Sequence, residues 1–364
     1  MLILRRHLSL RVQAAPNVLG GVPRLPWAWA VVGVAAVLAA ATVGVLVGPI
    51  HIGVGTVFRT LIAPLPWVGG ASTADSSQAS ILWSLRFPRV VLGAIVGGML
   101  ATAGAAYQGV FRNPLADPYL LGAAAGANLG ATLAITFAPG SSLIGVNAVP
   151  IAGFVGAGAA VAGAYALGRT VTGLRSTTGL ILAGVAIASF FNAIQTYVQQ
   201  AQSSSIRQVY SWILGRLSTV GWDGVVLVLP YVLLSVVVIF LHRRLLDALT
   251  VGEEEVNSLG ISARRVRLIV VIAATLGTAA VVAIAGTIAF VGIIIPHTVR
   301  LMVGRSYRVV VPLSMLFGAA FLVLADTAAR TVAAPAELPI GVITAFVGAP
   351  FFIAVMRSSR AAAI

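Results

Sequence analysis

The chain has 364 residues, of which 59% are hydrophobic and only 9% are charged. Soluble domains carry roughly 25% charged residues, so the composition excludes an ordinary soluble protein and is typical of a polytopic membrane protein. The sequence contains no cysteine, which excludes disulfides and Cys-ligated metals. It also contains no lysine, and a P-loop needs a lysine on the nucleotide phosphates, so the chain cannot be a P-loop ATPase by itself.

The formal net charge is +14, and all 23 basic residues are arginines. They fall in short runs between apolar stretches, as expected of loops on the cytoplasmic side of a membrane protein. The charge therefore reflects membrane topology, and we expect membrane lipid as a partner and no nucleic acid.

The first 26 residues form a basic leader that carries Arg5, Arg6, Arg11 and Arg24. An apolar run from Trp27 to Val47 follows, long enough to cross a bilayer and longer than the apolar core of a cleaved signal peptide. We expect a first span with the leader inside the cell. A signal peptide remains the alternative, since the alanines at 39–41 resemble a cleavage site.

Apolar runs separated by breakers predict ten transmembrane helices in one membrane domain, over 27–356, followed by a tail at 357–364. The expected spans are 27–47, 90–110, 120–138, 149–168, 178–200, 225–241, 268–285, 287–303, 309–329 and 340–356. Ten crossings place both termini in the cytoplasm and most arginines inside, as the positive-inside rule requires. The pair between 268 and 303 is short for two spans, so Gly286 and Gly292 are expected to allow a tight turn between uneven helices.

The segment NPLADPYLLG (113–122) contains two breaks, at Asn113-Pro114 and at Asp117-Pro118. Proline removes a backbone donor and disfavours helix at the preceding residue. Broken backbone at membrane depth is tolerated only where protein or a wet cavity surrounds it. The segment is either such a break or an ordinary loop. Nearby glycines at four-residue spacing, Gly93 with Gly97 and Gly122 with Gly126 and Gly130, predict closely packed helices.

The fifth span carries four amides at offsets of 0, 3, 7 and 10: Asn192, Gln195, Gln199 and Gln202. At about 100° per residue they share an arc of about 80° on one helix face. Such a face predicts the wall of a wet substrate pathway, for which we assign Asn192, Gln195 and Gln199. The alternative is a helix end that emerges into solvent.

A polar island, HRRLLDALTVGEEEVNSLGISARRVR (242–267), holds four of the nine acids and five of the arginines. It is too short for an enzyme domain and too long for a tight turn, so we interpret it as a platform presented to a soluble partner. Charged groups inside the spans are few. Asp326 and Arg330 have the spacing of a helix ion pair, and His297 is expected to be structural.

The distribution of ionisable residues along the sequence disfavours two other classes of function. An ion-coupled secondary carrier would need acids near the middle of the membrane, since intramembrane charges mark ion pathways. An intramembrane enzyme would need a catalytic constellation, and the four histidines are scattered at 7, 51, 242 and 297. We therefore predict no catalytic residues and no resident metal.

Long motifs in the sequence resemble the permeases for iron-siderophores, haem and vitamin B12, the FecCD family. They run in order from Arg86 to the C-terminus, about three quarters of the chain, and comprise RFPRVVLGAIVGGMLATAGAAYQGVFRNPLADPYLLG, LILAGVAI, VYSWILGRLS, SLGISARRVR, FVGIIIPHTVRLMVG and LADTAARTVAAPAELPIGVITAFVGAPFF. The resemblance implies an all-α, ten-helix type II ABC importer permease. It also implies a second permease subunit, identical or paralogous, two ATP-binding-cassette subunits and an extracytoplasmic substrate-binding protein.

The resemblance further implies roles for individual residues. Arg86, Arg89 and Arg330 match positions that receive acids of the binding protein, with headgroup anchoring as the alternative. Asn113 and Leu115, together with Thr177 and Thr178, match cytoplasmic gates. Coupling helices would span Leu246 to Gly260, with the ATPase contacts Leu249, Gly252, Glu253, Glu254, Leu259 and Gly260.

The expected function is therefore ATP-driven import of a metal chelate across the cytoplasmic membrane. Ferric siderophore is the leading cargo, and haem and vitamin B12 are alternatives. The chain itself would bind no cofactor, because ATP and Mg would belong to the partner ATPases.

Overall fold

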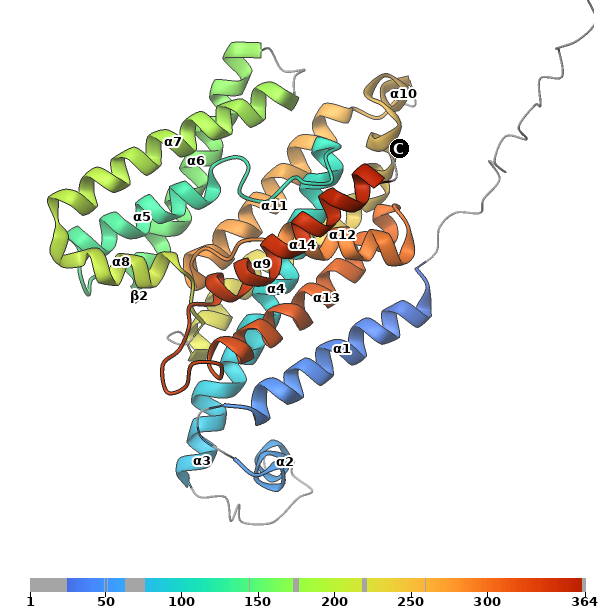
Figure 1. Cartoon of the computed structure of the whole chain (residues 1–364). Helices are drawn as coiled ribbons and strands as arrows, with labels where there is room; N and C mark the ends of the chain where they lie inside the picture. The colour runs from blue at the N-terminus through green and yellow to red at the C-terminus, as the bar shows by residue number, and fades with distance from the viewer. Residues whose placement is uncertain are drawn as a thin grey trace, which may run out of the picture.

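The computed structural model describes residues 25–48, 50, 52–62, 76–143, 145–172, 177–217, 221–258 and 260–361. Most of the basic leader and part of the loop between Gly48 and Leu85 lie outside these ranges. The described chain is almost wholly helical (Figure 1), with one antiparallel hairpin of β1 (Ser142–Leu143) and β2 (Val146–Asn147).

Within the part of the chain that the structure describes, seven helices are long and apolar enough to cross a membrane, as expected of a multi-pass membrane protein. They are α1 (Trp27–Leu46), the continuous helix over 77–111 that ends in α4 (Phe87–Phe111), α6 (Ala148–Thr172), α7 (Thr177–Ala201), α9 (Gly221–Val251), α11 (Ala263–Ala285) and α13 (Tyr307–Ala329). Three further apolar helices occupy the remaining expected spans: α5 (Ala123–Phe137), α12 (Val291–Val303) and α14 (Ile340–Ala361). The count of ten crossings stays a prediction, because α5 and α12 are shorter than the ~20 residues of a full span.

Short elements complete the two ends of the bundle. They are α2 (Val54–Ile62), α3 (Ser76–Ile81), the π-helical η1 (Leu82–Arg86), the 3-10 turn η2 (Ser203–Ser205), α8 (Ile206–Ile213) and α10 (Glu253–Ser258). In Figure 1, α10 lies at the same end as the start of α1 and the end of α14, whereas α2 and α3 lie at the opposite end. We call these the α10 end and the α3 end.

Helix α4 forms the centre of the bundle and packs against α13, α11, α9 and α12. Most of its residues are buried. A Cβ on Gly97 would lie 2.2 Å from the carbonyl oxygen of Gly318 in α13, and a Cβ on Gly104 would lie 2.0 Å from that of Gly292 in α12. Only glycine permits these close approaches, so the predicted packing role of Gly97 is confirmed.

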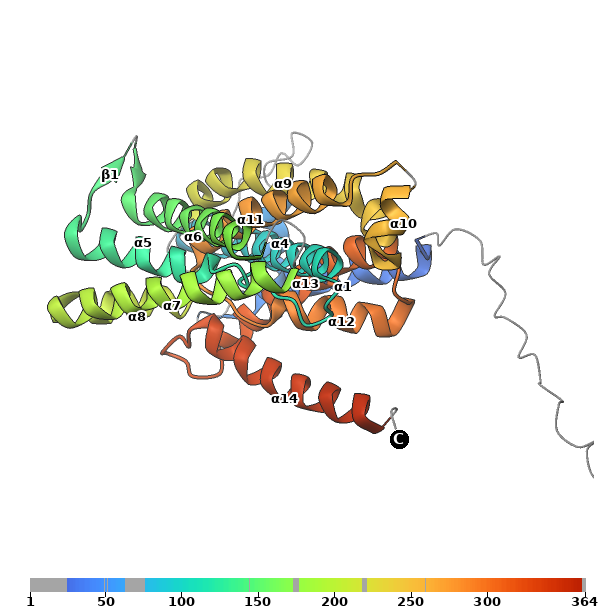
Figure 2. The same ribbon diagram turned by 90° about the horizontal axis from the view of Figure 1, so that it is seen from above.

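Helices α5, α6 and α7 form a second layer beside this core (Figure 2). Gly126 and Gly130 of α5 lie against backbone carbonyls of α6, as the glycine repeat predicted. Gly122 instead precedes α5 with φ of +82°, a conformation that favours glycine. Helix α14 packs along α12 and α13 and stands at the edge of the bundle (Figure 2).

The helices α11 and α12 are uneven, with 23 and 13 residues, as expected. The break between them lies at Gly286, with φ of +71°, and at Phe290, with φ of +70°. The prediction that Gly292 forms part of the turn was wrong. Gly292 lies inside the first turn of α12, where its missing side chain makes room for Pro118 and for α4.

Candidate functional site

The connection between α4 and α5 is a break that re-enters the bundle. The side chain of Asn113 accepts a hydrogen bond from the Leu115 amide at 2.9 Å, and Asp117 accepts one from the Tyr119 amide at 2.7 Å. These local turns replace the helix that Pro114 and Pro118 prevent. Asn113 and Leu115 are exposed at the α10 end.

The second half of this connection lies well inside the bundle. A Cβ on Gly292 would lie only 2.6 Å from Pro118. Gly292 in turn faces Gly104, which precedes the last residue of α4 by seven positions, or ~10 Å along the helix. The alternative of an ordinary surface loop is therefore wrong for this half.

Gln108 joins three parts of this region and was not singled out by the sequence analysis. Its side chain is buried, and its amide nitrogen donates to the carbonyls of Ala116, at 3.3 Å, and Gly292, at 3.1 Å. Its amide oxygen accepts from Arg300 on α12. The signal that could have identified it is a glutamine in an apolar span, since a buried amide needs partners for all its polar atoms.

The irregular segment at 286–290 also finds hydrogen-bond partners among polar groups of the bundle. The hydroxyl of Tyr119 donates to the Ile288 carbonyl at 3.0 Å, and the Thr287 hydroxyl donates to Asn128 at 2.8 Å. The Thr287 amide donates to the carbonyl of Ile213, the last residue of α8. This pattern is what irregular backbone at membrane depth requires. Two broken segments, 112–122 and 286–290, thus meet inside the protein.

An ionic cluster occupies the α3 end. Arg89 of α4 forms a two-pronged pair with Asp326 of α13, with the closest contact at 2.9 Å, and also pairs with Glu337 at 2.9 Å. Asp326 lies 3.7 Å from Arg330, so the predicted i, i+4 pair is present, although Arg89 is the closer partner. The cluster therefore holds α4 and α13 together at this end.

The expectation that Arg86 and Arg330 lie on the surface was wrong. Both are buried, with exposed fractions of 5% and 3%. Arg86 donates to the carbonyls of Val45, at 2.7 Å, and Leu46, at 3.2 Å. Arg330 donates to the carbonyl of Gly44. The two guanidinium groups satisfy carbonyls at the end of α1, which a helix terminus otherwise leaves unpaired.

The polar island 242–267 divides between the bundle and the surface. In the described parts of this island, 242–258 and 260–267, α9 continues to Val251 and α10 is the one separate short helix, so the expected pair of short helices is not found there. Leu249 is 2% exposed and packs in the core, so it cannot serve as the surface contact that we assigned. Gly252 is also buried, and Gly260 is exposed. Leu259 and the side chains of Glu253 and Glu254 lie outside what the structure describes.

The amide face of α7 is not uniform. Asn192 is exposed, Gln195 is 8% exposed, and Gln199 is half-buried. Gln195 is buried against the rest of the protein. The prediction that all three side chains form one wall of the pathway is therefore wrong for Gln195. The assignment of Asn192 and Gln199 to a pathway stays a prediction. Thr177 and Thr178 begin α7, but their side chains lie outside the described part.

Comparison with known proteins agrees with this architecture. The FecCD transport family model matches residues 28–358. The chain is 39% identical to YvrB of Bacillus subtilis (strain 168), described as an uncharacterized ABC transporter permease protein, over 86% of this chain and 88% of that protein. It is 42% identical to the cobalamin import system permease protein BtuC of Halobacterium salinarum, over 78% and 75% of the two chains.

The hemin transport system permease protein HmuU of Yersinia pestis is 35% identical, over 83% of this chain and 88% of that one. A solved structure described as the inward-facing conformation of a metal-chelate type ABC transporter superposes with a TM-score of 0.79 at 27% identity, covering 92% of this chain and 99% of that one. The chain therefore belongs to the FecCD transport family of ABC transporter permeases.

Proposed function

We propose that the chain is the membrane subunit of a binding-protein-dependent importer that moves a ferric siderophore across the cytoplasmic membrane by ATP-driven alternating access. The observation that carries this proposal is the meeting of two broken segments, 112–122 and 286–290, inside a helical bundle. Broken helices within membrane proteins form where a polar solute must pass or be held.

The sequence of the chain also indicates where the energy for transport would come from. A lysine-free sequence cannot form a P-loop, so ATP would be hydrolysed with Mg by two separate ATPase subunits. These would sit at the α10 end, where α10 and the exposed Gly260 form a polar surface. Both ends of the chain would then face the cytoplasm. Asn113 and Leu115, with Thr177 and Thr178, would form the inner gate.

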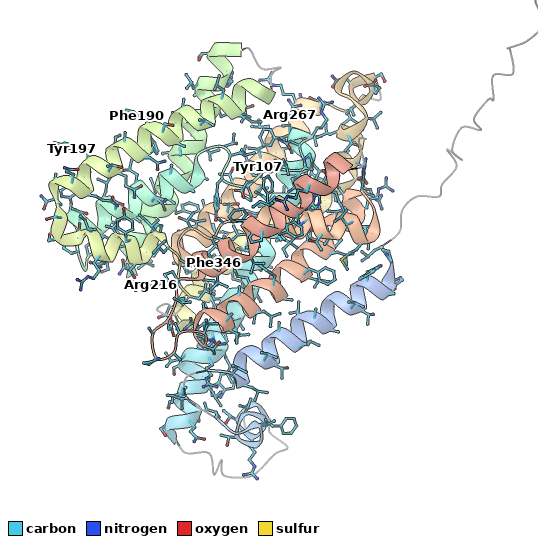
Figure 3. All side chains as sticks on the ribbon, in the orientation of Figure 1. Tyr107, Phe190, Tyr197, Arg216, Arg267 and Phe346 are labelled. Carbon is cyan, nitrogen blue, oxygen red and sulfur yellow. The ribbon has the colours of Figure 1, made fainter. Side chains whose placement is uncertain are left out.

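A second permease subunit would complete the pathway. Large apolar side chains are exposed on α7 and α14, among them Phe190, Tyr197 and Phe346, which Figure 3 labels. Both helices lie toward the same side of the bundle (Figure 2). A like subunit on that side would cover these faces and enclose a pathway that includes Asn192 and Gln199.

A substrate-binding protein would dock at the α3 end. Among the three arginines of the docking hypothesis, Arg89 is the one whose partner Glu337 is exposed, with 41% of its side chain accessible. Arg86 and Arg330 would support this surface from within by holding the end of α1.

Vitamin B12 and haem are the alternative cargoes. The relative with a cobalamin import name is 42% identical, and the relative with a hemin transport name is 35% identical. A relative named for iron(3+)-hydroxamate import, FhuB of Bacillus subtilis (strain 168), is 37% identical. These names support a large metal chelate as the class of cargo.

The test is uptake into proteoliposomes that contain the permease together with its ATPase and binding-protein partners. Ferric siderophore, cyanocobalamin and haem are offered separately, with ATP inside or with an imposed proton gradient. ATP-dependent uptake of one chelate supports the proposal. Uptake that follows the proton gradient without the ATPase would identify a secondary carrier and overturn it.

A further inference from the structure

A basic cavity of about 750 Å³ lies at the α10 end, close to the inner gate. Its walls come from the ends of α4, α9 and α12 and from the start of α13. Three arginines line it: Arg112, Arg300 and Arg305. Because the walls are helix ends, the cavity lies at the end of the bundle and not on its lipid-facing sides.

Among the residues that the structure describes, Asp247 is the one carboxylate that lines this cavity, and it already has partners. Its oxygens accept from the hydroxyl of Ser306 at 2.8 Å and from the amide of Tyr307 at 2.6 Å, and it pairs with Arg308 at 3.4 Å. It caps the start of α13 and pairs with Arg308, and among the described residues it forms no ion pair with Arg300 or Arg305. Arg300 and Arg305 therefore give the cavity positive charge.

Arg300 also lines this cavity. Its Nη2 atom donates to Gln108 and reaches the Pro114 carbonyl at 3.5 Å. Its Nη1 atom is enclosed, and its guanidinium group interacts with the side chain of Tyr307. Arg300 is therefore held in place by its neighbours, and a carboxylate that enters the cavity would meet a fixed positive charge.

We propose that this cavity receives an acidic side chain of the ATPase subunit, as a docking point separate from α10. The inference rests on the proposed function, since it assumes that an ATPase covers the α10 end. Asp247 and Thr250 of α9 line the cavity one to two turns before α10 begins, so a subunit seated on α10 would also cover the cavity. A carboxylate fits the fork of a guanidinium group with two parallel hydrogen bonds.

The contact would link the ATPase to the gate. Arg300 is joined through Gln108 to the carbonyl of Ala116, within the 112–122 segment. A carboxylate that pulls on Arg300 would therefore act on the gate segment through two hydrogen bonds. By this route, ATPase movement reaches Asn113 and Leu115 without passing through α10.

Arg305 gives the sharpest test, because it is exposed and its removal leaves the Arg300–Gln108 contact in place. The variants are Arg305→Gln and Arg305→Glu. Arg357→Gln and Arg357→Glu are matched controls, since Arg357 is exposed near the end of α14 and does not line the cavity. The affinity of the full-length permease for its ATPase is measured at low and high salt, with lipid phosphorus assayed in each sample.

We expect Arg305→Glu to weaken ATPase binding at least tenfold at low salt and to reduce its salt dependence, with a smaller effect for Arg305→Gln. The Arg357 variants should remain within about twofold of the parent protein. ATP hydrolysed per cargo imported should rise for Arg305→Glu.

Equal effects at positions 305 and 357 would overturn this inference. Loss of bound anionic phospholipid with unchanged ATPase affinity would assign the cavity to a lipid headgroup and also overturn it. If the parent permease bound no ATPase at all, the proposed function would fall as well. Parent binding with unaffected Arg305 variants would remove this inference alone.

Discussion

Arg300 on α12 donates a hydrogen bond to the side chain of Gln108 on α4, across 192 positions of the sequence. The same glutamine donates to Ala116 in the 112–122 segment and to Gly292 at the start of α12. One buried amide thus fixes the 112–122 segment to two helices, and these parts are expected to move as one body during transport.

Replacing Gln108 by Leu should uncouple the 112–122 segment from α4 and α12. The change leaves the carbonyls of Ala116 and Gly292 and one Arg300 donor without partners, so we expect a loss of about 1–3 kcal/mol of stability. ATP hydrolysed per cargo imported should rise, because the gate would no longer follow the helices. Gln200→Leu is the control, since Gln200 is exposed on α7. Thermal unfolding and coupled uptake assays measure the two effects.

The gate hypothesis predicts a specific failure for Asn113→Ala combined with Leu115→Ala. The double variant loses the turn formed by the 2.9 Å bond from the Leu115 amide to Asn113, so the gate should close poorly and ATP turnover should run without transport. Asn147→Ala is matched to it, because the Asn147 side chain accepts the same kind of 2.9 Å bond from the Val149 amide at the start of α6. If both variants keep normal coupling, the gate assignment fails.

The ionic cluster at the α3 end predicts unequal effects for its two acids. Asp326→Asn should destabilise the protein by about 3–5 kcal/mol, because it leaves Arg89 partly unpaired in a buried site. Glu337→Gln should cost less than about 1 kcal/mol, since Glu337 is largely accessible. Thermal melts in detergent compare the two. Similar melting temperatures would show that the cluster does not hold α4 to α13.

Docking of the binding protein can be separated from this structural role. Arg89→Lys keeps the charge but loses the two-pronged geometry, whereas Arg89→Glu also reverses the charge. If Arg89 meets an acid of the binding protein, association should fall more for Glu than for Lys, and its salt dependence should decrease. Equal losses would point to a role within the cluster alone.

The coupling hypothesis can be tested at Gly260, which is exposed and has φ of +77°. Gly260→Val forces a β-branched residue into a conformation that it disfavours, so the turn after α10 should distort and ATPase binding should weaken. Gly140→Val is the control, because Gly140 is also exposed with φ of +70° but lies next to the β1–β2 hairpin. ATPase co-purification with each variant is the measurement, and equal losses would refute the coupling role.

The pathway hypothesis can be tested with single cysteines in this cysteine-free chain. Asn192→Cys should react with a water-soluble thiol reagent, and protection should appear when cargo is bound. Gln195→Cys should react at least tenfold more slowly, because its side chain is buried against the rest of the protein. If Asn192→Cys is inaccessible in every nucleotide state, its face meets lipid or protein and the pathway lies elsewhere.

The sequence by itself determined the class of protein and the approximate positions of its longer helices. Apolar runs of about 20 residues and the Asn-Pro and Asp-Pro steps are local signals, and helix formation and breaking are decided locally. For the same reason the pattern correctly placed uneven helices on either side of Gly286 and a break after Asn113. The ATPase contacts and the pathway face remain hypotheses at the level of single residues.

Tertiary structure decided which polar groups are buried and which groups they contact. Arg86 and Arg330 were expected on the surface, yet both satisfy carbonyls of α1, a helix more than 35 positions away in sequence. Leu249 belonged to a polar island by sequence but packs in the core. No motif in the sequence indicated which groups the buried side chain of Gln108 contacts. Periodicity gives the face of a helix, but only the neighbours that pack against that face determine whether it is dry, wet or paired.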